Sequence, residues 1–317
     1  MVVRWRLEVA DPATGAALTD AVGVLLAVDD RFVTVQTRRG PVRIPRDRVV
    51  AAKEVPPRPT RRGAAHLAVS IEDLQRVMVP SWGAVERAEI GDWVLRASSG
   101  FTQRGNSTVP VGDPGVALPT AVDLVEDWYA ARRLPAKFAL AGPVGFDPAR
   151  DVLGRELVGR GYTAATRTTV MTASTDAIIA NDPGGPQAVV SERLDQVWLE
   201  IYRGTRETLA GATEAVLTGS PRQLFGRIER DRRPVAVARL GFGEGWAGLG
   251  AVWTDPDERG RGLAAHLTAE LARHAAAGGI RLVHLQVEQD NSRAQGLYER
   301  LGFQTHSAYA YLTSALA

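Results

Sequence analysis

The chain has 317 residues, of which 45% are hydrophobic and 23% charged, an ordinary balance for a soluble globular protein. Its formal net charge of +2 provides no general field that would gather nucleic acid. The lack of cysteine excludes disulfides, thiolate metal sites and a cysteine nucleophile. The five histidines show no metal-binding spacing such as HExxH. There is no signal-peptide core and no run of about 18 apolar residues, so a cytoplasmic protein with no metal and no membrane partner is expected.

Residues 1–58 are predicted to be all β. Short β-branched runs, separated by turns at Asp29-Asp30 and Gly40-Pro41, favour a small closed barrel. The runs are AVGVLLAVDD, RFVTVQTRRG and PVRIPRDRVVAAKEV. VPPRPTRRG follows at 55–63, and its three prolines and three arginines predict a stiff, solvated linker.

Residues 64–180 mix helix and strand. IEDLQRVMVPSW, VDLVEDWYAARR and DVLGRELVGRGY have helical spacing. DWVLRAS, FTQRGNSTVPV, KFALAG and TAATRTTVMTA are predicted strands. The loop NDPGGPQ at 181–187 marks the next boundary.

Residues 186–317 show a fuller version of the same order. A strand, AVVSERL, precedes two helices, DQVWLEIYRG and RETLAGATEAVL. QLFGRIERD, RPVAVARLGFGEG and WAGLGAVWT predict an antiparallel meander. A helix from GLAAHLTAELARHAAAG, a strand RLVHLQVEQD, a helix SRAQGLYERLG and a strand FQTHSAYAYLT complete the segment. Residues 153–171 and 295–312 both run helix, glycine, aromatic, strand, which indicates a weak internal repeat.

The loop DPDERGRGLAAHL at 255–267 allows more than one interpretation. It can be a helix start capped by Asp257 or Glu258. Its glycines also satisfy the dinucleotide pattern G-x-G-x-x-A, but an antiparallel meander precedes it where a βαβ strand should stand. A Walker A loop is excluded because no Gly-Lys-Ser/Thr follows. The third interpretation is a phosphate cradle, because a loop that enters a helix presents unpaired N–H groups.

TDPDERGRGLA resembles the R/Q-x-x-G-x-G/A signature of the GNAT superfamily of acyl-CoA-dependent N-acyltransferases, with Arg259, Gly262 and Ala264 at the defining positions. About 30 residues on, LQVEQDNSRAQGLYERLGF resembles the family's next strand, helix and turn. The resemblance covers residues 188–317 and implies acetyl-CoA (coenzyme A) as the cofactor. The cofactor-binding residues that it implies are Val252, Trp253, Thr254, Arg259, Gly260, Arg261, Gly262, Leu263, Ala264, Ala265 and Asn291.

The same resemblance places Tyr298 near the thiolate, where a phenol can donate the proton that the leaving sulfur needs. Some family members have a glutamate in L-E-V, where this chain has Gln286, which cannot act as a base. Glu288 is two residues further along the same strand face and becomes the candidate base, with His284 as an alternative. Either can instead be an ordinary strand residue. Glu200 and Tyr202 are candidates to line the acceptor pocket.

The middle segment resembles a degenerate GNAT copy, since GDPGVALPT stands where a signature loop would be. The polar residues Thr102, Arg104, Asn106 and Ser107 either face the acceptor or hold their own hairpin together. The first segment resembles the Src-homology-3-like barrel of some actinobacterial acetyltransferases. Its basic edge can be a solvated or protein-docking face, or a nucleic-acid contact. That edge contains Arg38, Arg39, Arg43, Arg46 and Arg48.

The fold class expected is α/β of the α+β kind: a mixed, mostly antiparallel GNAT sheet flanked by helices and duplicated, with a small N-terminal β-barrel. The expected function is acetyl-CoA-dependent transfer of an acetyl group to an amine, either a small molecule or a protein amine. The alternative is a non-catalytic acyl-CoA-binding or nucleic-acid-docking protein. Neither the acceptor nor the oligomeric state follows from the sequence.

Overall fold

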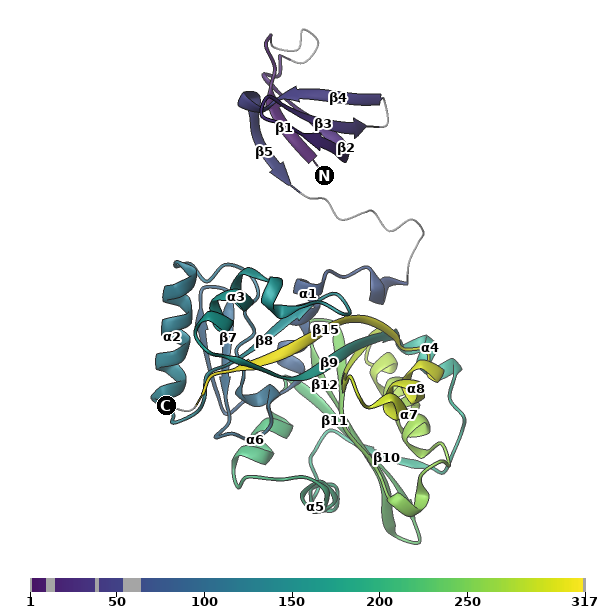
Figure 1. Ribbon diagram of the computed structural model, residues 1–317. Coiled ribbons are helices and arrows are strands. Elements are labelled where there is room, and N and C mark those ends of the chain that lie inside the picture. The colour runs from purple at the N-terminus through teal and green to yellow at the C-terminus, as the bar shows by residue number, and fades with distance from the viewer. Residues whose placement is uncertain (1, 10–14, 38–39, 54–63, 316–317) are drawn as a thin grey trace. The chain divides into compact units, whose positions relative to one another are not determined.

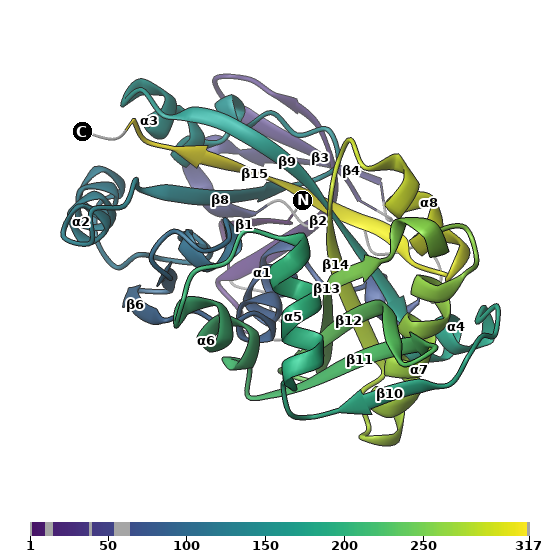
Figure 2. The same cartoon turned by 90° about the horizontal axis from the view of Figure 1, so that it is seen from below.

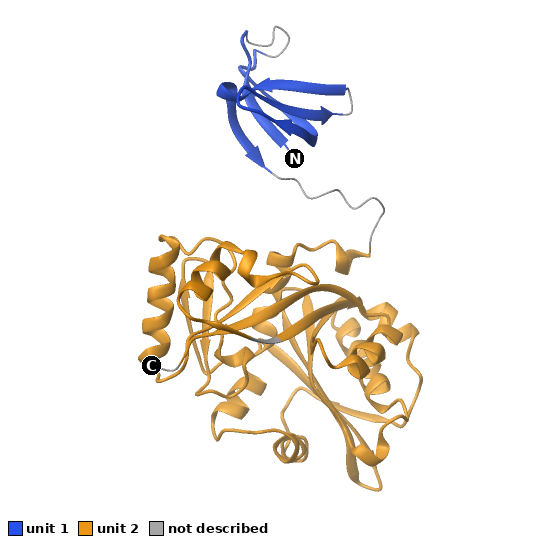
Figure 3. Cartoon of the chain, viewed as in Figure 1, with its two compact units in different colours: residues 1–63 blue, residues 64–317 orange. Residues whose placement is uncertain are grey.

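The computed structural model describes residues 2–9, 15–37, 40–53 and 64–315, and the chain divides into two compact units, residues 1–63 and 64–317 (Figure 3). Arg38, Arg39 and the linker predicted at 55–63 lie outside the described residues. The predicted split of the larger unit at 180–186 is not tested by this division and stays a prediction.

Unit 1 is an antiparallel sheet in the order β4-β3-β2-β1-β5 (Figure 1). Its strands are β1 (Val2–Arg6), β2 (Leu18–Val28), β3 (Phe32–Thr37), β4 (Gly40–Pro45) and β5 (Val49–Lys53). Alternate residues of β3, Val33 and Val35, point into a small core with Ile44. On the predicted basic edge, Arg43 stacks on Phe32 at 3.8 Å and Arg48 pairs with Glu8 at 2.6 Å.

Unit 2 is built on one eight-stranded sheet in the order β10-β11-β12-β13-β14-β9-β15-β8 (Figure 1). Only β13 and β14 pair in parallel among its described strands, and every other neighbour is antiparallel. The strands are β8 (Lys137–Gly142), β9 (Thr163–Ser174), β10 (Ala188–Ser191), β11 (Arg222–Arg230), β12 (Arg233–Gly243), β13 (Trp246–Thr254), β14 (Leu282–Glu288) and β15 (Gln304–Thr313). A separate hairpin pairs β6 (Glu86–Ile90) with β7 (Trp93–Ala97).

Helices cover both faces of this sheet because each strand buries alternate side chains on opposite sides. On β11, Leu224 packs with the core beside α7 (Leu263–Ala277), whereas the next residue, Phe225, packs with Trp198 of α5 (Gln196–Thr205). Figure 2 shows α5 lying across the strands of this half. The other helices are α1 (Ile71–Met78), α2 (Leu118–Ala130), α3 (Val152–Gly159), α4 (Thr175–Ala180), α6 (Ala212–Thr218) and α8 (Ser292–Arg300). This is the mixed, mostly antiparallel and helix-flanked fold that the sequence predicts.

The order of the strands departs from the order of the chain. β9, from the middle segment, lies between β14 and β15, and β15 pairs with β8 on its other side. The last strand of the chain therefore completes a sheet with strands that come 130 or more residues earlier. The two copies expected from the sequence share one continuous sheet.

Two local predictions were wrong. FTQRGNSTVPV is not a strand but a loop with one helical turn at Arg104–Asn106. The Asn106 amide bonds four backbone groups of this loop and so competes with strand pairing. The helix predicted from RETLAGATEAVL begins only at Ala212, because Gly211 has a φ of +77° that no helical residue adopts. No described helix combines the length and apolar composition that a bilayer crossing requires.

Candidate active site

The site is built on a fork between two strands. β13 and β14 run parallel and pair only from Trp246 with Leu282 to Leu249 with Leu285. Beyond this point β13 continues along β12, whereas β14 continues along β9. One edge of β13 is therefore left without a strand partner from Gly250 onward. Since alternate N–H groups of a strand point to each side, this edge offers unused donors to a bound molecule.

A bulge distorts β13 just where the fork opens. The pairing with β12 slips by one residue between Val237–Trp253 and Arg239–Gly250. The extra residue lies by Ala251, whose φ is +53°. A bulge bends and twists its strand locally, so it turns β13 away from β14 at this point. A side chain at positive φ is strained, and such strain clusters at functional sites.

The glycine loop, residues 260–265, lies at the mouth of the fork. Gly262 is the N-cap residue that precedes α7, with a φ of +77° and no side-chain cap. Asp257 and Glu258 belong to the preceding helical turn Pro256–Glu258 and do not cap α7, so the capped-helix interpretation is wrong. Among the described residues, no acceptor bonds the six successive N–H groups from 260 to 265. Such a run of free donors, at the positive end of a helix, favours an anion.

The fork and the glycine loop border one cleft of about 1100 Å³. Of the thirteen predicted site residues, only Arg261 does not line it, and this side chain pairs with Glu258 at 3.2 Å instead. The residues brought together are Val252, Trp253, Thr254, Arg259, Gly260, Gly262, Leu263, Ala264, Ala265, Glu288, Asn291 and Tyr298. The cleft is large enough to hold an extended ligand and a second, smaller molecule.

Asn291 is placed at the start of α8. Its side-chain oxygen accepts the Ala294 N–H at 3.1 Å and so caps this helix. Asn291 also lines the cleft, and its amide NH₂ group has no hydrogen-bond partner among the described residues. The residue that the sequence motif assigns to the cofactor therefore also sets the direction of α8, which carries Tyr298.

Tyr298 is buried on α8, with its ring edge-on to Phe303 at 5.7 Å. Burial raises the pKa of its phenol to about 12, although the charge of Arg206 acts in the opposite direction. At neutral pH the phenol therefore keeps its proton, which is the state that a proton donor needs.

The candidate bases on β14 have different surroundings. Glu288 is exposed at the end of the strand and lines the cleft. Gln286 also lines the cleft, where its carbonyl oxygen accepts the Tyr309 hydroxyl at 2.8 Å. His284 does not line it: the ring is 1% exposed, has no hydrogen-bond partner, and burial lowers its pKa to about 3. A buried, neutral His284 cannot take a proton from an acceptor in the cleft.

Comparison with known proteins identifies the fold and the family. The family model described as "Probable histone acetyltransferase Rv0428c C-terminal" matches residues 68–312. The chain belongs to this family. The Mycobacterium tuberculosis (strain ATCC 25618 / H37Rv) protein named "Probable histone acetyltransferase Rv0428c" is 30% identical over 303 residues, which cover 93% of this chain and 89% of that one.

Two solved structures share the fold of this acetyltransferase. The GCN5-related N-acetyltransferase from Kribbella flavida has a TM-score of 0.58 at 19% identity, over 77% of this chain and 95% of its own. The tandem GNAT protein from the clavulanic acid biosynthesis pathway has a TM-score of 0.52 at 14% identity, over 62% of this chain and 70% of its own. These structures confirm the predicted fold class, and the family model and the mycobacterial relative confirm GNAT membership and an acetyltransferase activity.

The middle segment of the acetyltransferase also contributes to the cleft. Thr102 and Arg104 line it, whereas Asn106 and Ser107 are buried and hold the loop together. In the first helix of the C-terminal segment, Tyr202 lines the cleft and Glu200 does not. The lining residues that sequence reasoning missed include four large side chains that no motif surrounds: Trp82, Arg206, Tyr309 and Tyr311.

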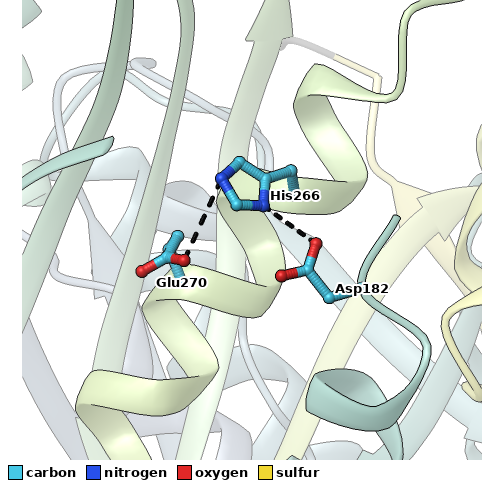
Figure 4. Close-up of side chains that lie close together, drawn as sticks. All are labelled: Asp182, His266 and Glu270. Atoms are coloured by element: carbon cyan, nitrogen blue, oxygen red, sulfur yellow. Dashed lines mark hydrogen bonds and ion pairs between the residues drawn. The ribbon is translucent and has the colours of Figure 1, made fainter. Parts of the chain in front are cut away.

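One cluster outside the cleft has the composition of a metal site. Asp182, His266 and Glu270 place their ligand atoms within 4.8 Å of one another (Figure 4). Their atoms are already engaged, however: the His266 ring nitrogens contact Asp182 at 2.8 Å and the Pro186 carbonyl at 3.1 Å. Arg273 pairs with both carboxylates at 2.6 Å. The cluster therefore fastens the 181–187 loop to α7, whose first turn continues directly from Gly260 and Gly262.

Proposed function

We propose that this acetyltransferase moves an acetyl group from acetyl-CoA to an amine. The observation that carries the proposal is the run of free N–H groups from 260 to 265, at one end of the same cleft that holds the open edge of β13 and Tyr298. A pyrophosphate needs donors without competing acceptors and a backbone that it can approach closely. Gly260 fits this requirement, because its Cα faces open space at a φ of +82°.

The residues that would hold acetyl-CoA follow from this arrangement. The amides of the glycine loop, with Arg259 beside them, would bind the pyrophosphate. Val252, Trp253 and Thr254 would bind the pantetheine arm through the open edge of β13, and Asn291 would add its amide group. When bound, acetyl-CoA supplies the acetyl group as a thioester.

The remaining residues support the chemistry of transfer. An N–H group of β13 beyond the bulge would polarise the carbonyl, since a fixed donor in a closed cleft stabilises developing negative charge. Glu288 would accept the proton of the amine, directly or through water. Tyr298, which keeps its proton at neutral pH, would protonate the leaving sulfur.

The experiment that tests the proposal combines binding with turnover. Isothermal titration calorimetry measures acetyl-CoA binding to the full chain, and thiol release with a panel of amines measures transfer, with mass spectrometry of the product. We expect binding together with amine-dependent release of coenzyme A. Acetyl-CoA that does not bind contradicts the assignment of the cleft. Binding without transfer to any amine supports the non-catalytic alternative.

A further inference from the structure

Arg104 is the feature of the cleft that the acetyl-CoA assignment leaves without a role. Arg104 is half-buried and lines the cleft, its Nε is buried without a hydrogen-bond partner, and no described carboxylate lies within ion-pair distance. It rests against the Trp82 ring at 5.0 Å. A partly buried cation without a counter-ion loses hydration that nothing in the protein replaces, so a protein that retains one needs a reason.

The loop that carries Arg104 is held rigidly. The Asn106 side chain bonds the backbone at Ser98, Gly100, Phe101 and Thr102. Thr102, at a φ of +60°, accepts the Gly105 N–H at 3.0 Å. A loop fixed in this way presents its arginine in one place, which is what recognition of a small ligand requires.

Arg104 lies at the inner end of the fork, away from the glycine loop. A methyl group added to Gly250 would lie 3.9 Å from Arg104 Nη1. Gly250 follows Leu249, the last residue of β13 that pairs with β14. A strand rises about 3.3 Å per residue, so roughly 13 Å separate Gly250 from Thr254, beside which Arg259 donates to the strand. Arg104 is therefore badly placed for the pyrophosphate and well placed for the acceptor.

Positive charge prevails at this inner end. Arg239 is fully buried, and its guanidinium bonds the Leu217 and Ser81 carbonyls and the Ser220 hydroxyl, with no carboxylate among its described partners. Burial, and then the charge of Arg104, lower the pKa of Arg239 to about 9. Arg206 also lines the cleft and donates to the Val252 carbonyl at 3.3 Å. An anionic group on the acceptor would neutralise this charge, whereas a basic peptide would be repelled.

We infer that the acceptor is a short amine that also carries a carboxylate, such as an amino acid, and that Arg104 binds this carboxylate beside the fork. The inference rests on the proposed function, because it names the substrate class of the same cleft. The carboxylate must lie only a few bonds from the amine, since Arg104 is next to Gly250 and the acetyl group is expected one or two residues further along β13. A planar guanidinium suits a carboxylate because two parallel hydrogen bonds can form.

The test compares each acid with its uncharged amide. Thiol release is measured with the twenty α-amino acids, β-alanine and 4-aminobutyrate, each beside its amide, and with a basic peptide. For the best acceptor we expect kcat/KM to be about 10- to 100-fold higher for the acid, the range for hydrogen bonds to a charged group. Arg104→Met should bring this ratio close to one, mainly through KM, and Arg104→Lys should restore part of it.

Two controls separate recognition from a structural role. Arg150→Met removes an arginine that is 89% exposed and does not line the cleft, so the acid-to-amide ratio should not change. The Tm of Arg104→Met should equal or exceed that of the wild type, because the substitution removes an unpaired cation. A purely structural Arg104 would lower Tm and affect acids and amides alike.

The outcomes also separate this inference from the function on which it rests. Three outcomes, each with acetyl-CoA binding and some amine turnover, overturn the inference alone: equal turnover of acids and amides, turnover of amides but of no acid, and preference for the basic peptide. An unchanged ratio in Arg104→Met does the same. Failure of acetyl-CoA to bind overturns the proposed function.

Discussion

Replacement of Gly262 with valine tests the phosphate cradle most directly. The backbone at Gly262 has a φ of +77°, so a side chain there costs about 1–2 kcal/mol of folding free energy. The added Cβ would meet Pro183 Cγ at 3.4 Å, an ordinary contact, so the protein itself has room for it. The branches of the valine would then cover the free N–H groups that follow.

The expected loss of affinity can be worked from those donors. A hydrogen bond to a charged group is worth about 1.5–3 kcal/mol. If the valine screens two of the N–H groups between 263 and 265, binding weakens by about 3–6 kcal/mol, or roughly 10²- to 10⁴-fold in Kd. Isothermal titration calorimetry with acetyl-CoA measures this loss.

Gly279 provides the matched control. It lies just beyond the other end of α7, has a φ of +85°, and a Cβ there would meet nothing within 4 Å. Gly279→Val should therefore lower Tm about as much as Gly262→Val but leave the Kd for acetyl-CoA unchanged. The cradle assignment is refuted if Gly262→Val binds acetyl-CoA within about threefold of the wild type.

Three further predictions concern the cleft and the strand beside it. Tyr298→Phe should keep the Kd for acetyl-CoA but lower kcat at least 10-fold, and unchanged turnover would show that Tyr298 is not the acid. Because burial raises the pKa of this phenol to about 12, the kcat of the wild type should not decline below pH 10 through loss of the Tyr298 proton. Glu288→Gln should lower kcat at pH 7 by about 10²-fold with the Kd for acetyl-CoA unchanged, and equal activity in stopped-flow assays would assign the base elsewhere. Burial lowers the pKa of His284 to about 3, so the unfolded chain takes up a proton at this residue before the folded one does. The free energy of unfolding is therefore fully retained above pH 6.5 and decreases as the pH falls towards 3. The decrease is about 5 kcal/mol, at ~1.4 kcal/mol per tenfold change in proton affinity. His284→Leu should flatten this part of the curve in urea titrations, and a parallel curve would show that other groups dominate acid unfolding.

Much of the secondary structure could be predicted because it depends on local pattern. The three strands of the meander and helix α7 were recognised from the spacing of their apolar residues, which reflects burial on one or both faces. The loop at 98–107 was mistaken for a strand because its conformation is held by the Asn106 side chain. Neither alternation nor propensity reports such side-chain bonds.

Some residues of the candidate site could likewise be predicted from the sequence, and others could not. The cofactor end was accessible from the sequence because the glycine loop and α8 are continuous stretches, each with its own spacing. Tyr309 and Tyr311 are two residues apart on β15 and so share one face, which is a weak sign of a functional surface. The sequence did not show which face of that strand meets the cleft. His284, Gln286 and Glu288 share one face by alternation, yet burial separates the neutral histidine from the exposed carboxylate.

The sequence by itself determined the family resemblance, most of the elements and the position of the anion cradle, since all of these depend on residues close together in the chain. Only the tertiary structure decided that β9 enters the sheet between β14 and β15, that β13 and β14 part after Leu249, and that Arg104 lies beside this opening. Strand order and the approach of distant loops depend on packing between segments more than 100 residues apart, which no local pattern encodes.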